Sequence, residues 1–253
     1  MVDARSAFLN GGYYRPILDG LIEAASPRQA HTILDLGCGE GFYTMGLYDS
    51  LLSSGNAPGA DFSASLPGQS VRHILGVDIS REAIIASCRR YRNYVSAEDT
   101  FARQPVSPPV SLTWLVASGA ALPVKSASVD LVTCLFTRIM PAEMYRVLSR
   151  SGKLVVAGAG ENHLHELRSL LYSHVRQKRF SPEKVLSDQF VSGEKRRVEC
   201  TICVEQVQQL KNLLMMTPHA WRVAPEKQVL LAGLVGRPIS IDVELEVWYP
   251  AVP

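Results

Sequence analysis

The sequence contains no apolar run close to the roughly 20 residues that a membrane-spanning helix needs. Its start, MVDARSAFLN, lacks the charged-then-apolar layout of a secretory signal peptide. The five cysteines are scattered and odd in number, which argues against a disulfide framework. The 26 Lys and Arg residues nearly balance the 24 Asp and Glu residues, so the net charge of +2 points to neither nucleic acid nor an anionic membrane. These absences predict a cytoplasmic protein with no membrane partner.

What the sequence does contain is typical of a folded globular chain. Apolar residues make up 47% and charged residues 20%, and a length of 253 residues fits a single domain. Residues 3–25 predict two short helices around Gly11 and Gly12, within an N-terminal helical cover of residues 1–30. The stretch 53–70 is rich in Gly, Ser, Ala and Pro, which predicts a surface insertion, with a lid over the site as the alternative.

Elsewhere, expected strands alternate with expected helices. The strands fall at residues 32–36, 71–77, 112–116, 129–135, 153–156 and 197–204. The helices fall at 42–52, 81–92 and 142–148. A further helix runs from beyond 163 to about 176, and the last one follows the strand at 197–204 and ends at 216. Such alternation predicts an α/β fold, with a parallel sheet covered by helices on both faces. The strict polar–apolar alternation of PISIDVELEVWY, residues 238–249, predicts an antiparallel edge strand.

The segment ILDLGCGEGFYT, residues 33–44, predicts a strand, a glycine turn and a helix. Glycines after a parallel strand let a ligand approach the main chain without meeting a Cβ atom, and the following helix offers free N–H groups. A dinucleotide fingerprint would read G-x-G-x-x-G, with an acid about 20 residues later. Here Gly37, Gly39 and Gly41 are spaced G-x-G-x-G, Asp35 precedes them, and the next acid that ends a strand is Asp78. The segment is therefore a poor match to a dinucleotide site.

Together with GVDIS at residues 76–80, this segment resembles the first motifs of the class I S-adenosylmethionine-dependent methyltransferases. The resemblance implies that Asp35 helps to bind the methionine amino group, that Asp78 holds the ribose hydroxyls, and that Ile79 lies beside the adenine. An ionised carboxylate can accept hydrogen bonds from two adjacent hydroxyls, which agrees with the role implied for Asp78. The implied fold is Rossmann-like, with a mostly parallel seven-stranded sheet and an antiparallel edge strand.

Two later stretches, ASGAALPVKSASVDLVTCLF and MYRVLSRSGKLVVAG, resemble the third to fifth motifs of the same superfamily. They imply that Ala117 and Ser118 lie beside the adenine and that Phe136 ends the fourth strand. ARSAFLNGGYYRPI, ENHLHELRSLLY and LLMMTPHAW are similar to the bacterial 23S rRNA guanine-N1 methyltransferases. This closer resemblance implies that Tyr14, Gly39, Glu40 and His163 contact the cofactor.

The predicted cofactor is S-adenosyl-L-methionine. Its predicted contacts are Tyr14, Asp35, Gly37, Gly39, Glu40, Gly41, Asp78, Ile79, Ala117, Ser118 and His163. The predicted catalytic residues, which would line the acceptor pocket, are Tyr14, Phe136 and His163.

The chain departs from the guanine-N1 methyltransferases in its N-terminal part. Members of that family begin with a zinc module of three cysteines and a histidine, and this sequence begins where that module would have ended. Cys200 and Cys203 form a lone pair within a strand, and His163-x-His165-Glu166 is not a zinc motif, so no metal site is expected. The basic clusters at 176–180 and 194–197 favour solvated surface over an RNA contact.

These observations leave three functional hypotheses open. The first is an enzyme acting on a small molecule, by methyl transfer or by attack at another sulfonium carbon. Its extreme form is cyclisation of the cofactor itself to a cyclic amino acid and methylthioadenosine. The second is a 23S rRNA guanine-N1 methyltransferase whose RNA-binding module is trimmed away or supplied by another chain. The third is a non-catalytic scaffold that binds the cofactor.

Overall fold

A computed structural model describes residues 1–52, 72–98, 110–175, 180–220 and 225–251. The expected insertion at 53–70 lies outside these residues. Residue contacts group the chain into two compact units. Unit 1 comprises Met1–Gly20, Ala157–Ser181 and Lys195–Leu245, and unit 2 comprises Leu21–Val156, Pro182–Glu194 and Glu246–Pro253. Each unit is described by itself below.

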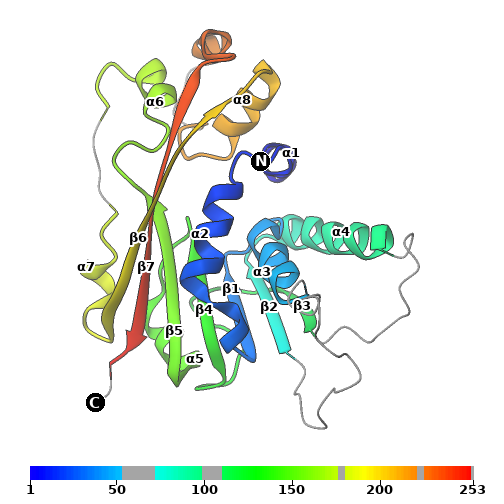
Figure 1. The fold of residues 1–253 in the computed structure, drawn as a ribbon, viewed down its shortest axis with the longest axis vertical. Helices are drawn as coiled ribbons and strands as arrows, with labels where there is room; N and C mark the ends of the chain where they lie inside the picture. The colour runs from blue at the N-terminus through cyan, green and yellow to red at the C-terminus, as the bar shows by residue number, and fades with distance from the viewer. Residues whose placement is uncertain (53–71, 99–109, 176–179, 221–224, 252–253) are drawn as a thin grey trace, which may run out of the picture. The chain divides into compact units, whose positions relative to one another are not determined.

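The secondary structure alternates between helix and strand over much of the chain (Figure 1). The helices are α1 Val2–Asn10, α2 Arg15–Ala25, α3 Phe42–Leu52, α4 Arg81–Glu98, α5 Pro141–Val147, α6 His165–Leu171, α7 Glu183–Leu186 and α8 Val207–Met215, with 3-10 segments η1 Pro27–Gln29 and η5 Pro225–Leu234. The strands are β1 Thr32–Leu36, β2 Arg72–Asp78, β3 Val110–Val116, β4 Val129–Leu135, β5 Leu148–Ala159, β6 Phe190–Cys203 and β7 Pro238–Pro250. The described helices include none that is long and apolar enough to cross a membrane.

The strands form one seven-stranded sheet in the order β3-β2-β1-β4-β5-β7-β6. Strand β1 pairs in parallel with β2 on one side and with β4 on the other, and β2 pairs in parallel with β3. The chain order therefore reverses between β1 and β4. In open α/β sheets, this reversal point opens a crevice at the carboxyl ends of the strands, where ligands bind. The predicted fold, a mostly parallel sheet with helices of the Rossmann type, is confirmed.

The prediction that residues 238–249 form the edge strand is wrong. Strand β7 lies between β5 and β6, and β6 is the edge. Two of the three carboxylates in this alternating run, Asp242 and Glu246, are each only 2% exposed. Alternation reports the polarity of side chains, whereas the position of a strand depends on which other strand pairs with it. The true edge carries the charged run at 194–197, which is typical of a strand protected from pairing with other chains.

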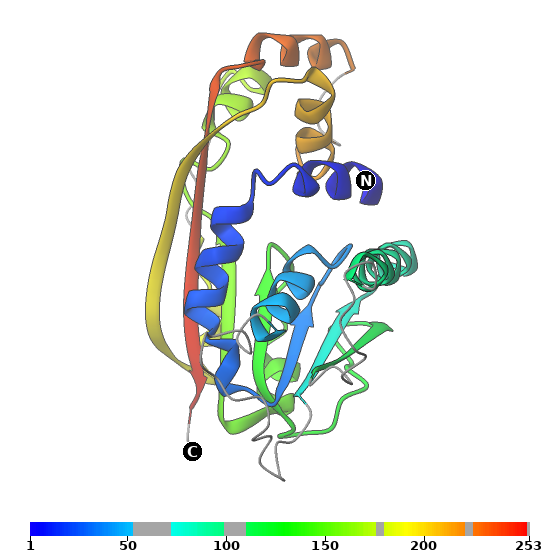
Figure 2. The same cartoon turned by 45° about the vertical axis from the view of Figure 1, so that its right-hand side comes forward.

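Unit 2 contains the core around β1. Its buried apolar side chains come mainly from β1, β2, β4 and β5 and include Ile33, Leu34, Ile74, Leu131, Val132 and Leu154. Helices α3 and α4 pack against β2 and β3, as both views show (Figures 1 and 2). The chain then crosses to the other side of β1, so right-handed crossovers place α5 on the opposite face of the sheet.

Unit 1 is built from the N-terminal helix and later segments. Helix α1 packs against α8, and η5 packs against both α8 and α6. The fully buried Phe8, Leu9, Leu167, Leu210 and Leu213 form its core. The predicted break between two N-terminal helices is confirmed, because Gly12 has a φ of +79° between α1 and α2.

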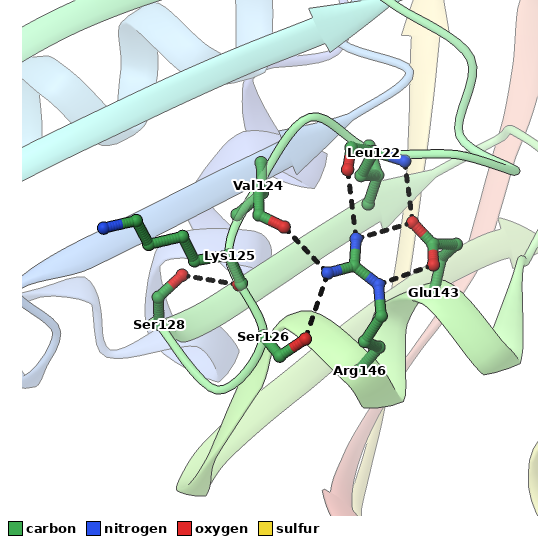
Figure 3. Close-up of polar contacts among 7 residues, drawn as sticks. All are labelled: Leu122, Val124, Lys125, Ser126, Ser128, Glu143 and Arg146. Atoms are coloured by element: carbon green, nitrogen blue, oxygen red, sulfur yellow. Dashed lines mark hydrogen bonds and ion pairs between the residues drawn. The ribbon is translucent and has the colours of Figure 1, made fainter.

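In unit 2, Arg146 of α5 fixes the segment that leads into β4 (Figure 3). Its guanidinium donates to both carboxylate oxygens of Glu143, at 2.7 and 2.8 Å, and to the carbonyl oxygens of Leu122 and Val124, at 3.0 and 2.8 Å. A fifth bond, at 3.2 Å, reaches the hydroxyl of Ser126. All five N–H groups of the guanidinium are thereby used. The hydrogen bond from Arg146 lowers the pKa of Glu143 to about 2.

Replacing Arg146 by methionine should lower the melting temperature by about 4–8 °C at pH 7, because Glu143 and two carbonyl groups lose their donor. Differential scanning calorimetry measures this change. The matched control is Arg15→Met, which removes an exposed pair with Asp19 of the same N–O distance, 2.8 Å. Exposed pairs contribute little, so the control should shift the melting temperature by less than about 2 °C. Equal shifts in the two variants would show that the Arg146 network adds no stability.

Candidate functional site

The turn after β1 depends on three glycines. Gly37, Gly39 and Gly41 have φ values of +74°, +59° and +82°, a left-handed conformation that other residues rarely adopt. A Cβ atom at Gly37 would lie 2.6 Å from the side chain of Thr137, and one at Gly41 would lie 2.8 Å from the indole of Trp114. The glycines are therefore required by backbone conformation and by close packing, in addition to any ligand.

Asp78, at the end of β2, ties this turn to the neighbouring strand. Its carboxylate accepts the backbone N–H groups of Gly39 and Ser80, at 2.9 and 2.8 Å. Ser80 in turn caps α4, as predicted, by accepting the N–H of Ala83 at 3.2 Å. A carboxylate has about four acceptor positions. The half-buried Asp78 therefore retains positions for the two hydroxyls of a ribose.

Apolar side chains are exposed where β2, β3 and β4 end. Ile79 is 76% exposed, Val116 is 53% exposed and Phe136 is 37% exposed. The backbone N–H of Ala117 donates to the carbonyl of Asp78 at 3.0 Å, which joins the ends of β2 and β3. Phe136 has a φ of +54°, a strained conformation for an aromatic residue and one that is often found at functional sites. These ends can offer apolar contact to a flat ring such as adenine.

Asp35 and Glu40 lie deeper, with 2% and 1% exposure. The two carboxylate oxygens of Asp35 accept the hydroxyls of Thr44, in α3, and Thr133, in β4, the second at 2.8 Å. Glu40 accepts, through its backbone carbonyl, the Nε–H of Arg90 at 3.0 Å. Asp35 thus links β1, β4 and α3 at the point where the strand order reverses. Its contact with a methionine amino group stays a prediction.

Unit 2 therefore brings together the predicted cofactor residues of the strand ends. Gly39 and Asp78 are hydrogen-bonded, Ala117 is bonded to Asp78, and Ser118 follows in the same turn. Two hydroxyl residues that anchor Asp35 were missed from the sequence, Thr44 and Thr133. Their partner lies 9 residues away in one case and 98 in the other, so no local pattern could reveal the second contact.

The predicted residues Tyr14 and His163 meet in unit 1. The hydroxyl of Tyr14 lies 3.2 Å from Nε2 of His163, and the two side chains are 3% and 9% exposed. The ring of Phe8 packs edge-on against Tyr14 at 5.5 Å. The third predicted catalytic residue, Phe136, belongs to unit 2. The roles predicted for these residues stay predictions.

Within the described ranges, no group of three or more His, Cys, Asp or Glu side chains is placed to hold a metal ion. Cys200 and Cys203 are free cysteines on β6.

Three kinds of comparison with known proteins find similar chains. The model of the ubiE/COQ5 methyltransferase family matches residues 14–174. A Bacillus subtilis (strain 168) protein named "Putative 23S rRNA (guanine-N(1)-)-methyltransferase YxjB" is 25% identical over 97% of this chain and 78% of its own length. Solved structures support the fold alone. They include a geranyl diphosphate methyltransferase in complex with SAM (TM-score 0.50, 14% identity, 92% and 84% of the two chains covered) and the [4+2]-cyclase SpnF (TM-score 0.53, 13% identity, 94% and 81% covered).

Proposed function

The chain belongs to the ubiE/COQ5 methyltransferase family, and on that premise we propose that it binds S-adenosylmethionine and acts on a small-molecule acceptor. The observation that carries the proposal is the Asp78 carboxylate, which is bonded to the glycine turn and flanked by the exposed Ile79. In this proposal Asp78 accepts the ribose hydroxyls, while Ile79, Ala117 and Ser118 contact the adenine.

The glycine turn and the hydrogen-bonded side chain of Asp35 fix the backbone at the carboxyl end of β1, where the cofactor would bind. The remaining predicted contacts, Tyr14 and His163, are assigned to the cofactor through the resemblance to the guanine-N1 enzymes. When bound, S-adenosylmethionine supplies an electrophilic carbon on its sulfonium. The work of the protein is then to hold a nucleophile in line with the breaking C–S bond and to exclude water. Because no covalent protein intermediate is required, the chain needs no nucleophilic side chain.

A small acceptor is favoured by the near balance of charge, because RNA binding usually shows as an excess of Lys and Arg gathered on one face. The chain has 26 Lys and Arg residues against 24 Asp and Glu residues. The acceptor attacks the methyl carbon or another sulfonium carbon. Attack by the cofactor's own amino nitrogen would give a cyclic amino acid and methylthioadenosine.

The second candidate function is methylation of 23S rRNA at guanine N1. The alignment with YxjB favours it, because that alignment extends over 97% of this chain. The two candidates share the cofactor site and differ in the acceptor.

One experiment separates these activities. The protein is incubated with isotope-labelled S-adenosylmethionine, with and without 23S rRNA and with a cell metabolite extract, and the products are identified by mass spectrometry. A methylated metabolite, or methylthioadenosine with a new amino acid, supports the proposal. Methylthioadenosine formed without any acceptor identifies the cyclisation. Label in rRNA alone would replace the proposal by the second candidate, and no consumption under any condition would overturn both.

A further inference from the structure

Helix α4 contacts the glycine turn through two side chains that donate to consecutive carbonyl groups of the turn. The hydroxyl of Ser87, which is fully buried, donates to the carbonyl of Gly39 at 2.9 Å. The Nε–H of Arg90, about one helical turn further along α4, donates to the carbonyl of Glu40 at 3.0 Å. All four residues belong to unit 2. The turn is therefore bonded to α4 as well as to the end of β2.

Gly39 is held at both of its backbone polar groups. Its N–H donates to the carboxylate of Asp78 at 2.9 Å, and its carbonyl accepts from Ser87. Glycine populates positive and negative φ with similar ease, so the peptide groups beside it can rotate at low cost. In a trans peptide the C=O and N–H point in opposite directions, and rotation of the group between Gly39 and Glu40 would exchange their sides. The bond from Ser87 opposes this rotation.

The hydroxyl of Ser87 bonds outside its own helix. Its single hydrogen has two acceptors within reach, the carbonyl of Gly39 at 2.9 Å and that of Ala83, four residues earlier in α4, at 3.2 Å. Serine in a helix commonly donates to the carbonyl four residues earlier. Ser96 of the same helix makes that bond, to the carbonyl of Arg92 at 2.9 Å. The shorter contact of Ser87 is instead to the glycine turn.

Packing brings α4 close to the rest of the turn. A Cβ atom at Gly41 would lie 3.0 Å from the hydroxyl oxygen of Ser87. The guanidinium of Arg90 lies over the ring of Phe42, the first residue of α3, at 5.9 Å from the ring centre. Such a cation–π contact restricts where the guanidinium can lie. Helix α4 thus contacts the chain from Gly39 to Phe42.

We propose that Ser87 and Arg90 are positioning residues which hold the glycine turn in its ligand-binding conformation before a ligand arrives. This inference rests on the proposed function, in which the turn lies beneath S-adenosylmethionine. A segment that is already ordered loses less conformational freedom when it binds, which strengthens binding. The affinity for the cofactor is therefore set in part by side chains of α4 that act through the turn.

Ser87→Ala and Arg90→Met test the effect on binding, each for its own residue. Isothermal titration calorimetry should show that either variant binds S-adenosylhomocysteine, the demethylated cofactor, about fivefold more weakly, because the turn populates conformations that do not bind. The matched control is Ser96→Ala, which removes a bond within α4 and should bind like the wild type. A variant whose affinity stays within about twofold of the wild type would overturn the role of its residue. Equal weakening in Ser96→Ala would overturn it too.

Amide hydrogen exchange, followed by NMR in the free protein, separates positioning from a general loss of stability. The N–H groups of Gly39 and Gly41 are both hydrogen-bonded. They should exchange about fivefold faster in Ser87→Ala and in Arg90→Met than in the wild type, while the amides of β1 keep their rates. Excess S-adenosylhomocysteine should remove the difference, because the ligand then holds the turn.

Two exchange results would contradict the positioning role. The first is an unchanged rate at the glycine turn of the free variants, and the second is an equal acceleration in β1, which would indicate destabilisation of the whole unit. Failure of the wild type to bind S-adenosylhomocysteine would overturn the proposed function instead. The exchange rates of the free protein would then still decide whether α4 holds the turn.

Discussion

Asp78→Ala should abolish measurable binding of S-adenosylhomocysteine, with a loss of at least about 100-fold in affinity. The carboxylate accepts two backbone N–H groups in the protein and, in the proposed function, two ribose hydroxyls. Hydrogen bonds to a charged group contribute about 1.5–3 kcal/mol each, so losing the two hydroxyl contacts costs about 3–6 kcal/mol of binding free energy. Isothermal titration calorimetry of purified variants measures this loss.

A loss of stability alone could mimic this result, and Asp130 provides the control. Its carboxylate also accepts two backbone N–H groups, those of His31 and Thr32, both at 3.0 Å. These residues lie at the start of β1, whereas the glycine turn follows its end. Asp130→Ala should lower the melting temperature about as much as Asp78→Ala and leave affinity unchanged. If Asp78→Ala kept an affinity within about threefold of the wild type, the ribose role of Asp78 would be wrong.

His163 should make the protein markedly less stable in mild acid. Its folded pKa of about 4 lies below the ordinary value of 6.5, mainly because of burial, with Arg168 and His219 lowering it and Asp242 opposing them. Between pH 6.5 and about 4 the unfolded chain therefore binds a proton that the folded chain does not. Stability falls as the pH drops through this window, by about 3 kcal/mol for this group. Urea unfolding at a series of pH values measures the change.

The comparison is with His163→Gln, whose side chain can accept from Asp242 and donate to Tyr14 without titrating in this range. This variant should lose about 3 kcal/mol less than the wild type between pH 6.5 and 4. His165→Gln, which removes an exposed histidine two residues along the same segment, should follow the wild type at every pH. Parallel curves for His163→Gln and the wild type would show that His163 does not titrate as a buried group.

Much of unit 2 could be predicted from local sequence. The bounds of β1, α3 and β4 were predicted to the residue, because each is an apolar run with a clear end. The start of α4 was predicted from Ser80, whose hydroxyl caps it. The glycine turn and Asp78 could also be recognised from local sequence, because they belong to two short motifs, residues 33–44 and 76–80.

What could not be predicted depends on partners far away in the chain. Strand β6 begins at Phe190, seven residues before its expected start, because pairing with β7 supports a segment whose own composition is polar. The short helix α7 was not predicted. The pairing of Arg197 with Asp242 joins residues 45 positions apart, and each reads in isolation as a surface charge. The helix expected from beyond 163 to about 176 ends at Leu171, and residues 176–179 lie outside the described ranges.

The indole of Trp114 has a consequence for how sequences of this kind can diverge. A Cβ atom at Gly41 would lie 2.8 Å from this ring, and one at Gly76, in β2, would lie 2.4 Å from it. One bulky side chain thereby prohibits any other side chain at two separate positions. Gly41 is also required by its φ of +82°, so a smaller residue at position 114 should free position 76 alone. Homologues that accept alanine at position 76 should therefore carry a smaller residue in place of the indole, whereas position 41 should stay glycine in both groups.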